Sequence, residues 1–290
     1  MRPTTRVPDR AQLLTAEAIV ARHLAVTPLV EFAGPGARLH LKVETVQPTG
    51  SFKIRGALAA LAAAAPDRPV IAASAGNHAL GIAHAAELLG RSATVVVPTT
   101  ASAAKVQRLA RFDVRLVQAG DGYDAAEAHG LQLAAGEDAR FVSAYNDADV
   151  IAGQRTLAVE IGRQMRGPMT IVCPVGGGGM LAGVALWASE QPDVRVVGVE
   201  AAASRALSAA VRAGHVVDVA VGPTLADGMA GGLEAGSVTV EIARRHVDEL
   251  IAVDEAALRD AIRALAFEQG IVVEGAGAAA AAAVLSGLVV

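Results

Sequence analysis

The sequence predicts an α/β fold made of two three-layer domains with mostly parallel sheets. From Pro69 onward, short runs rich in valine and isoleucine alternate with longer patterns rich in alanine and leucine. Such alternation is typical of a mostly parallel sheet with helices on both faces. Because seven or eight strands are many for one small sheet, we expect two packed domains with a ligand cleft between them.

The expected strands follow one another along the chain, separated by helical segments. The first, residues 39–43, precedes a tight turn at residues 48–51. In the second half of the chain, the helix expected at residues 255–269 has the clearest ends, with Asp254 as its N-cap and Gly270 as its stop. Seven further strands are predicted from the valine and isoleucine runs, at residues 70–73, 93–97, 114–118, 140–143, 170–174, 194–199 and 249–253.

Composition favours a globular protein that binds small molecules. With 290 residues, of which 53% are hydrophobic, the chain can bury a substantial core. No apolar run reaches the roughly 18 to 20 residues of a membrane helix, and the N-terminus resembles no secretory signal. A net charge of −4 with mixed signs and only 3% aromatic residues predict no nucleic-acid partner. The single cysteine, Cys173, fits a reducing cytoplasm and a place in the core.

The segment at residues 48–56, Pro-Thr-Gly-Ser-Phe-Lys-Ile-Arg-Gly, places Lys53 on the first turn of a helix between Phe52 and Ile54. The positive end of the helix dipole and the apolar neighbours both lower the pKa of a lysine. More of the amine is then free to form a Schiff base with a carbonyl compound. Taken alone, the same segment also describes an ordinary turn with Ser51 as N-cap and a lysine that reaches solvent.

The strand at residues 70–73 is followed by Ser74, Ala75, Gly76, Asn77 and His78, where a helix begins. Backbone N–H groups at a helix start, together with the three polar side chains, can bind a carboxylate or a phenolate-like oxygen. Locally, an asparagine N-cap and a histidine bonded to nearby backbone explain these residues equally well.

The strand at residues 170–174 is followed by four glycines, Gly176, Gly177, Gly178 and Gly179. Glycine lets the backbone approach a phosphate closely and aim several N–H groups at it. The loop lacks the lysine of a P-loop and the spacing of a dinucleotide fingerprint. A flexible surface loop is the alternative, although four glycines lose much backbone entropy there. A reactive amine, an anion-binding loop and a phosphate loop together fit pyridoxal phosphate and a carboxylate substrate.

On nine motifs, the chain resembles the fold-type II pyridoxal-phosphate enzymes of the serine/threonine dehydratase and serine racemase group, which share the tryptophan synthase β-like fold. The resemblance implies a large cofactor-binding domain of residues 1–66 plus 148–290 and a small mobile domain of residues 67–147. The motifs lie at residues 27–29, 41–44, 47–56, 74–78, 150–154, 176–180, 198–200, 226–228 and 274–278.

The resemblance also implies a role for each matching residue. Lys53 would form the internal aldimine, and Asn77 would bond the hydroxyl oxygen of the cofactor ring. Phe52 and Gly228 would enclose that ring, and Glu274 would belong to the same cofactor site. The backbone of Gly176, Gly177, Gly178, Gly179 and Met180 would hold the phosphate, and the loop Ser74, Ala75, Gly76, Asn77 and His78 would bind the substrate.

The activity implied by the resemblance is a pyridoxal-phosphate-dependent ammonia-lyase. Lys53 would remove the Cα proton of L-threonine or L-serine, and loss of water and ammonia would give 2-oxobutyrate or pyruvate. Small 3-hydroxy amino acids are the expected substrates, and a homodimer is the expected assembly.

Position 75 separates this activity from an amino-acid racemase, the first alternative. Racemases of the group resemble Ser-Ser-Gly-Asn-His, where the second serine is an acid/base on the substrate face opposite the lysine. Alanine cannot transfer a proton, so Ala75 favours elimination. The β-replacement enzymes resemble Thr-Ser-Gly-Asn-Thr-Gly, which His78 does not match.

Two departures from the family pattern affect the expected sites. Racemase-like members bind a divalent cation through a glutamate, a carbonyl and an aspartate, but Ala206 stands in the place of the aspartate. We therefore expect no metal, with Glu200 at most a weak site. The family's last strand, whose serine or threonine bonds the pyridine nitrogen, has no counterpart after Leu285. A non-catalytic protein with a truncated C-terminus, binding pyridoxal phosphate or an amino acid, is the second alternative.

Overall fold

The computed structural model describes residues 5–32 and 38–289 of the chain. The chain divides into two compact units, one formed by Met1–Val26 with Val46–Thr156 and the other by Thr27–Thr45 with Leu157–Val290. Each unit has its own parallel sheet. Among the described residues, no helix combines the length and the apolar character that a membrane crossing requires.

The sheet of the first unit has four parallel strands in the order β5-β4-β3-β6. Two of the strands have the bounds expected from the sequence, and β6 ends two residues earlier than expected, although the Val142 N–H still donates to the Ile71 carbonyl at 2.8 Å. The strands are β3 (Val70–Ala73), β4 (Ala93–Val97), β5 (Arg115–Gln118) and β6 (Arg140–Phe141).

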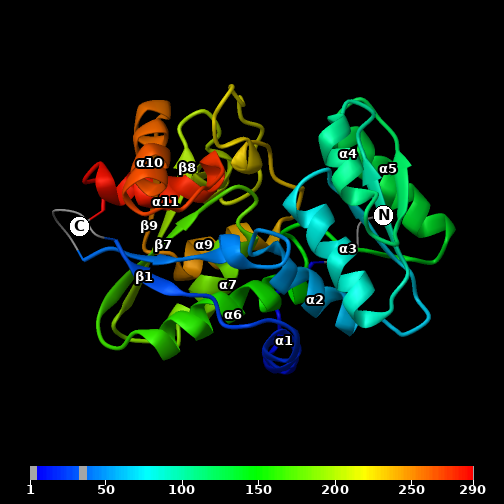
Figure 1. Cartoon of the computed structure of the whole chain (residues 1–290), viewed down its shortest axis with the longest axis horizontal. Coiled ribbons are helices and arrows are strands. Elements are labelled where there is room, and N and C mark those ends of the chain that lie inside the picture. The colour runs from blue at the N-terminus through cyan, green and yellow to red at the C-terminus, as the bar shows by residue number, and fades with distance from the viewer. Residues whose placement is uncertain (1–4, 33–37, 290) are drawn as a thin grey trace. The chain divides into compact units, whose positions relative to one another are not determined.

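Helices cover both faces of this sheet because its strands are apolar on both sides. Val70 and Ala72 pack in one cluster with residues of α2 and α3, whereas Ile71 and Ala73 pack in another with residues of α5. Figure 1 shows α2 and α3 side by side. The helices are α1 (Arg10–His23), α2 (Lys53–Ala63), α3 (Asn77–Leu89), α4 (Ala103–Leu109) and α5 (Tyr123–Gly136), and α6 (Ala148–Gln164) runs from this unit into the next.

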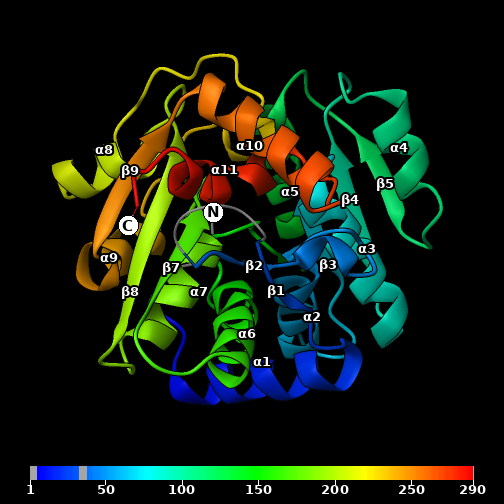
Figure 2. The same ribbon diagram turned by 60° about the vertical axis from the view of Figure 1, so that its left-hand side comes forward.

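The second unit contains a parallel sheet of three strands in the order β7-β8-β9, which Figure 2 shows side by side. A short antiparallel hairpin, β1 with β2, belongs to the same unit. β1 was not expected from the sequence, because it has three residues and no valine or isoleucine run. The strands are β1 (Leu29–Glu31), β2 (His40–Lys42), β7 (Met169–Pro174), β8 (Val194–Ala201) and β9 (Glu249–Val253).

Alternate residues of β8 face different helices. Val199 packs in a cluster with α10 and α11, whereas a Cβ atom on its neighbour Gly198 would lie 2.9 Å from the Leu181 side chain of α7. The sheet therefore lies between two helical layers. The helices are α7 (Gly179–Ala188), α8 (Ala206–Ala213), α9 (Val238–His246), α10 (Glu255–Glu268) and α11 (Gly275–Leu285), with short 3-10 turns at Glu44–Val46 (η1) and Asp227–Met229 (η2).

Two α/β units with parallel sheets confirm the predicted fold class. Asp254 caps α10 as expected, since its carboxylate accepts from the Ala257 N–H at 2.8 Å. The division into residues 1–66 plus 148–290 and residues 67–147 stays a prediction. The compact units group the lysine segment with the sheet of residues 70–141.

Candidate functional site

Lys53 begins α2, directly after a tight turn. Gly50 has a φ of +77°, a left-handed conformation that favours glycine. Phe52 occupies the N-cap position in a helical conformation, and no side chain caps the helix. Ser51 is therefore not the N-cap. Its hydroxyl is buried and has no hydrogen-bond partner among the described residues.

The amine of Lys53 is half-buried and bonded to the backbone after β6. Its Nζ donates to the Ala144 carbonyl at 3.0 Å. The same nitrogen lies 5.3 Å from the centre of the Phe52 ring. Ile54 on the other side is fully buried. These contacts agree with the expected partial desolvation of the amine.

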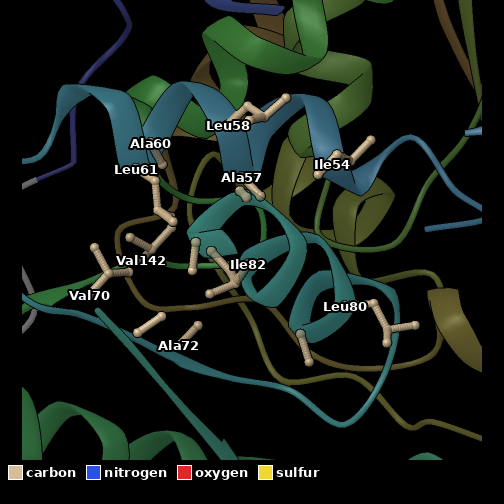
Figure 3. Packing of buried hydrophobic residues seen from close by; sticks show 14 of the residues in the cluster. Ile54, Ala57, Leu58, Ala60, Leu61, Val70, Ala72, Leu80, Ile82 and Val142 are labelled. Carbon is tan, nitrogen blue, oxygen red and sulfur yellow. The ribbon is translucent and has the colours of Figure 1, made fainter. Parts of the chain in front are cut away.

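Close packing of α2 on α3 places the polar loop at residues 74–78 near Lys53. A Cβ atom on Gly81 of α3 would lie 3.1 Å from the carbonyl carbon and oxygen of Lys53. Figure 3 shows the apolar side chains that hold the two helices together over β3, among them Ile54, Leu58 and Ile82. A larger residue than glycine at position 81 would push the helices apart.

In the loop itself, the side chains of Ser74 and His78 both form hydrogen bonds to the backbone. The Ser74 hydroxyl accepts from the Gly76 N–H at 3.1 Å, which shapes the turn before Asn77 starts α3. His78 is buried, and its Nε2 lies 3.2 Å from the Val142 carbonyl. Burial and the charge of Lys53 lower the pKa of His78 to about 3, so its imidazole is neutral at pH 7.

Ala75 is half-buried and packs against the apolar cluster that includes β3, α2 and α3. Its methyl group offers no hydrogen-bonding atom. Phe52, Lys53 and the five residues from Ser74 to His78 thus all belong to the first unit, and the structure brings Lys53 and His78 to the same short segment of backbone.

The glycine loop lies in the second unit, between β7 and α7. Gly178 has a φ of +84°, and a Cβ atom there would lie 3.1 Å from Cβ of Thr239. A Cβ atom on Gly176 would lie 3.1 Å from Cα of Met229. No side chain caps the start of α7. The positive end of this helix and its backbone N–H groups fit a phosphate, and the loop leaves little room for a side chain at positions 176 and 178.

Three other predicted residues lie beside this loop or at its end. Met180 is on the first turn of α7. Gly228 precedes Met229, which contacts Gly176. A Cβ atom on Gly228 would lie 3.7 Å from a carboxylate oxygen of Glu274. The structure therefore gathers the glycine loop, Gly228 and Glu274 within the second unit.

The carboxylate of Glu200 binds backbone and side-chain groups at the start of α8. Its carboxylate accepts from the Leu207 N–H at 2.8 Å and from both the N–H and the hydroxyl of Ser208. Burial raises the pKa of Glu200, against the opposing effect of these hydrogen bonds. Within the described part of the chain, no group of three or more acidic, histidine or cysteine side chains is arranged for a metal ion. The expectation of no metal, with Glu200 at most a weak site, stays a prediction.

Sequence reasoning missed the backbone carbonyls of Val142 and Ala144 and the side chain of Thr239, whose hydroxyl donates to the Gly177 carbonyl at 2.9 Å. The place of the first pair depends on a strand pairing that only the folded chain shows. β6 is the neighbour of β3, and the carboxyl ends of neighbouring parallel strands meet at one edge of the sheet. No signal in the sequence pointed to Thr239.

Several proteins of known sequence are similar to this chain. It is 40% identical to the L-threonine ammonia-lyase of Thermotoga maritima over 257 residues, which cover 87% of this chain and 64% of that protein. It is 37% identical to the catabolic L-threonine dehydratase TdcB of Escherichia coli, over 86% of this chain and 77% of that protein. The chain thus spans slightly less than two thirds of the first relative's length.

Solved structures agree with these relatives. Maize serine racemase has a TM-score of 0.91 at 29% identity, covering 98% of this chain and 88% of that one. The processed form of threonine deaminase isoform 2 from Solanum lycopersicum has a TM-score of 0.87 at 29% identity, covering 97% of this chain and 82% of that one.

The family described as "Pyridoxal-phosphate dependent enzyme" matches residues 20–288. This match confirms pyridoxal phosphate as the expected cofactor, and the helix start and glycine loop described above fit its phosphate. With most of its length matched, the chain belongs to the pyridoxal-phosphate dependent enzyme family.

Proposed function

We propose that this protein is an ammonia-lyase that removes water and ammonia from L-threonine or L-serine, giving 2-oxobutyrate or pyruvate. The names of the relatives support the proposal, since those at 40%, 39% and 37% identity are threonine ammonia-lyases and a threonine dehydratase. The observation that carries it is the environment of Lys53, a half-buried amine at a helix start, held by the Ala144 carbonyl.

Lys53 is the one lysine of the chain whose surroundings suit a reactive amine. The sequence contains two others, Lys42 and Lys105. Lys42 forms a buried ion pair with Glu160 at 2.7 Å, which stabilises its charged form. Lys105 is exposed on α4 and has the ordinary environment of a surface lysine.

Pyridoxal phosphate supplies an electrophilic aldehyde for the substrate amine and a ring that accepts the electrons left on Cα when its proton is removed. We assign the phosphate to the start of α7 and to the backbone of Gly176, Gly177, Gly178, Gly179 and Met180. Asn77 would bond the ring hydroxyl oxygen, Phe52 and Gly228 would contact the ring faces, and Glu274 lies beside Gly228.

In this proposal Lys53 accepts the Cα proton on Nζ, and the Ala144 carbonyl receives one of the resulting N–H groups. The substrate carboxylate binds at the loop of Ser74, Ala75, Gly76, Asn77 and His78. His78 would contribute through its backbone, because its imidazole is buried and bonded to Val142. Ala75 offers no acid or base, so no second group there returns a proton to Cα.

Amino-acid racemisation is the second candidate, favoured by the likeness to maize serine racemase. Ala75 weighs against it, because proton return from the face opposite the lysine requires a side chain that carries a proton. A protein that binds the cofactor without turnover is the third.

One set of measurements separates the three. The full chain is incubated with pyridoxal phosphate, reduced with borohydride and digested, and we expect the pyridoxyl group on the peptide that contains Lys53. A panel of 3-hydroxy amino acids is then assayed for 2-oxo acid and for the opposite enantiomer. We expect 2-oxo acid, a loss of at least about 100-fold in Lys53→Ala, and no loss in the exposed control Lys105→Ala.

Each other result excludes the proposal. Enantiomer without 2-oxo acid identifies a racemase, and a bound cofactor without turnover of any substrate identifies a binding protein. A chain that binds no cofactor contradicts all three candidates.

We also propose that the enzyme works as a homodimer in the cytoplasm. The dimer rests on the family resemblance, and the compartment on a single cysteine that is buried in β7. Light scattering on the purified chain tests the dimer, and a mass of about one chain, 29.3 kDa, contradicts it.

A further inference from the structure

A short segment after β6, residues 142–144, binds both Lys53 and His78. The Val142 carbonyl lies 3.2 Å from Nε2 of His78, and the Ala144 carbonyl accepts from Nζ of Lys53 at 3.0 Å. The Val142 N–H continues the sheet by donating to the Ile71 carbonyl at 2.8 Å. The segment is thus joined to β3 by its backbone and to α2 and α3 by side chains.

The bond to Val142 determines which nitrogen of His78 carries the proton. A carbonyl oxygen only accepts, so Nε2 donates and Nδ1 is left with a lone pair. Nδ1 is buried and has no hydrogen-bond partner among the described residues. Burial and the charge of Lys53 lower the pKa of His78 to about 3, which keeps the ring in this neutral form.

The charged groups nearby also favour the neutral imidazole of His78. Lys53, on α2, is the cation that acts on the imidazole, and a second positive charge there would be repelled. Arg140, on β6, is paired with Asp147 at 2.9 Å and with Asp149 at 2.7 Å. These carboxylates are therefore bonded to an arginine and not to His78.

The bonds of Lys53 and His78 lie at the starts of α2 and α3, and the packing of these helices sets the distance between them. Gly81 brings α3 against the carbonyl group of Lys53, so α2 and α3 cannot slide past each other at this point. The residues after β6 are held in part by the Ser143 hydroxyl, which accepts from the Asn146 N–H at 3.1 Å. His78 adds a bond to the Val142 carbonyl, which is two residues before the carbonyl that receives Lys53.

We infer that His78 is a positioning residue for Lys53: it holds the segment of residues 142–144 so that the Ala144 carbonyl receives the lysine amine whenever that amine is free. The inference rests on the proposed function, in which the amine of Lys53 acts as a base. It assigns His78 a role distinct from the substrate binding expected of its loop.

The first test compares the reactivity of the Lys53 amine in the cofactor-free full chain. The pH dependence of its acylation is followed by mass spectrometry of the peptide that contains it, with Lys105 as internal reference. In His78→Leu the imidazole N–H that binds the Val142 carbonyl is lost. The Ala144 carbonyl then no longer stabilises the ammonium form of Lys53, and we expect the pH midpoint of Lys53 labelling to fall by about one unit. In His78→Gln the amide replaces the Nε2 donor, and we expect the wild-type midpoint.

His84, on the same helix but in edge contact with Phe112, provides the matched control. His84→Leu should leave the Lys53 midpoint unchanged. An unchanged midpoint in His78→Leu overturns the inference, and so does an equal shift in His78→Gln. Either result shows that the hydrogen-bond donor at position 78 does not affect the Lys53 amine.

The second test needs no variant that destabilises the fold. In the full chain with ¹⁵N-labelled histidine, His78 should show a neutral ring protonated at Nε2 from pH 8 down to pH 5, with His78→Gln used for assignment. A ring protonated at Nδ1, or one that titrates near its ordinary value of about 6.5, overturns the inference. Neither test measures 2-oxo acid, so a chain without lyase activity would contradict the proposed function and still allow both tests of His78.

Discussion

Ala75 is the residue on which we propose that the choice between elimination and racemisation depends. It follows Ser74 at the end of β3, and its methyl group packs against the apolar cluster of β3, α2 and α3. In the proposed function, Lys53 is then the acid/base that remains for the Cα proton. A protein with this arrangement should remove the proton and seldom return it to the other face.

Restoring a hydroxyl at this position should raise racemisation. In Ala75→Ser we expect the ratio of enantiomer formed to 2-oxo acid formed to rise at least about tenfold, because general acid-base groups contribute about 10²- to 10⁴-fold. Chiral chromatography of the remaining serine measures this ratio. Ala75→Gly, which adds no hydroxyl, is the control, and an equal rise in that variant would contradict the argument.

His78 should also make stability depend on pH in a predictable direction. Its pKa is about 3 in the folded protein and about 6.5 in an unfolded chain, so between these values the unfolded chain binds the proton and the native chain does not. The contribution is fully present above pH 6.5 and is lost as the pH falls toward 3. The free energy of unfolding should decrease by about 1.4 kcal/mol per pH unit from this group.

Urea unfolding of wild type and His78→Gln between pH 7 and pH 4 measures this contribution. The variant lacks the titrating ring, so its curve should be flatter than that of the wild type. Parallel curves for the two proteins would show that His78 does not titrate differently on folding.

Among the elements, the connection from β7 to α7 shows how a loop can be shaped for an anion. Ile171 and Cys173 of the strand are buried, three glycines at positions 176–178 precede the helix, and the helix begins without a side-chain cap. Thr239 of α9 closes one side by donating to the Gly177 carbonyl. Both the left-handed φ of Gly178 and its contact with Thr239 require glycine there.

Gly178→Ala should weaken cofactor binding at least about tenfold, equivalent to about 1.4 kcal/mol, because the new methyl group displaces the loop against Thr239. Fluorescence titration with pyridoxal phosphate measures the dissociation constant. Gly214→Ala is the matched control: Gly214 has a φ of +77° but nothing within 4 Å of an added Cβ atom. That variant should lose about 1 to 2 kcal/mol of stability from backbone strain and keep its affinity, whereas equal affinities for both variants would contradict a role for the loop.

For the whole molecule, the core of the second unit contains a natural reporter of unfolding. Cys173 lies in β7 with 2% of its surface exposed, and burial raises the pKa of its thiol to about 12. Trp187 of α7, the single tryptophan of the chain, packs in the same unit against Gly162. One thiol and one indole therefore report on the same unit.

The Cys173 thiol should be unreactive toward a thiol reagent in native buffer at pH 8 and react fully in denaturant, since only the exposed thiolate is nucleophilic. Its labelling midpoint in guanidinium should coincide with that of Trp187 fluorescence. Pyridoxal phosphate at 100 times its dissociation constant should slow native-state labelling about 100-fold. Rapid labelling of the native protein would contradict the position of Cys173 in the core.

Much of the fold could be predicted because its signals are local. The strands at Val70–Ala73, Ala93–Val97 and Glu249–Val253 have the expected bounds, since buried parallel strands are apolar runs bounded by polar or turn-forming residues. Asp254 was identified as a cap by its position alone. β1 could not be predicted, because a three-residue strand that pairs with β2 is defined by its partner and not by its own sequence pattern.

The chemistry of the candidate site was already present in the order of the amino acids. A lysine at a helix start, a polar loop after one strand and four glycines after another indicate an amine, an anion-binding loop and a phosphate loop, because these properties belong to a few adjacent residues. Their resemblance to a known family identified the cofactor. The contacts of these residues required the folded chain. The carbonyls of Val142 and Ala144 carry no signature in the sequence, since every residue has a carbonyl, and only the pairing of β6 with β3 brings them to His78 and Lys53.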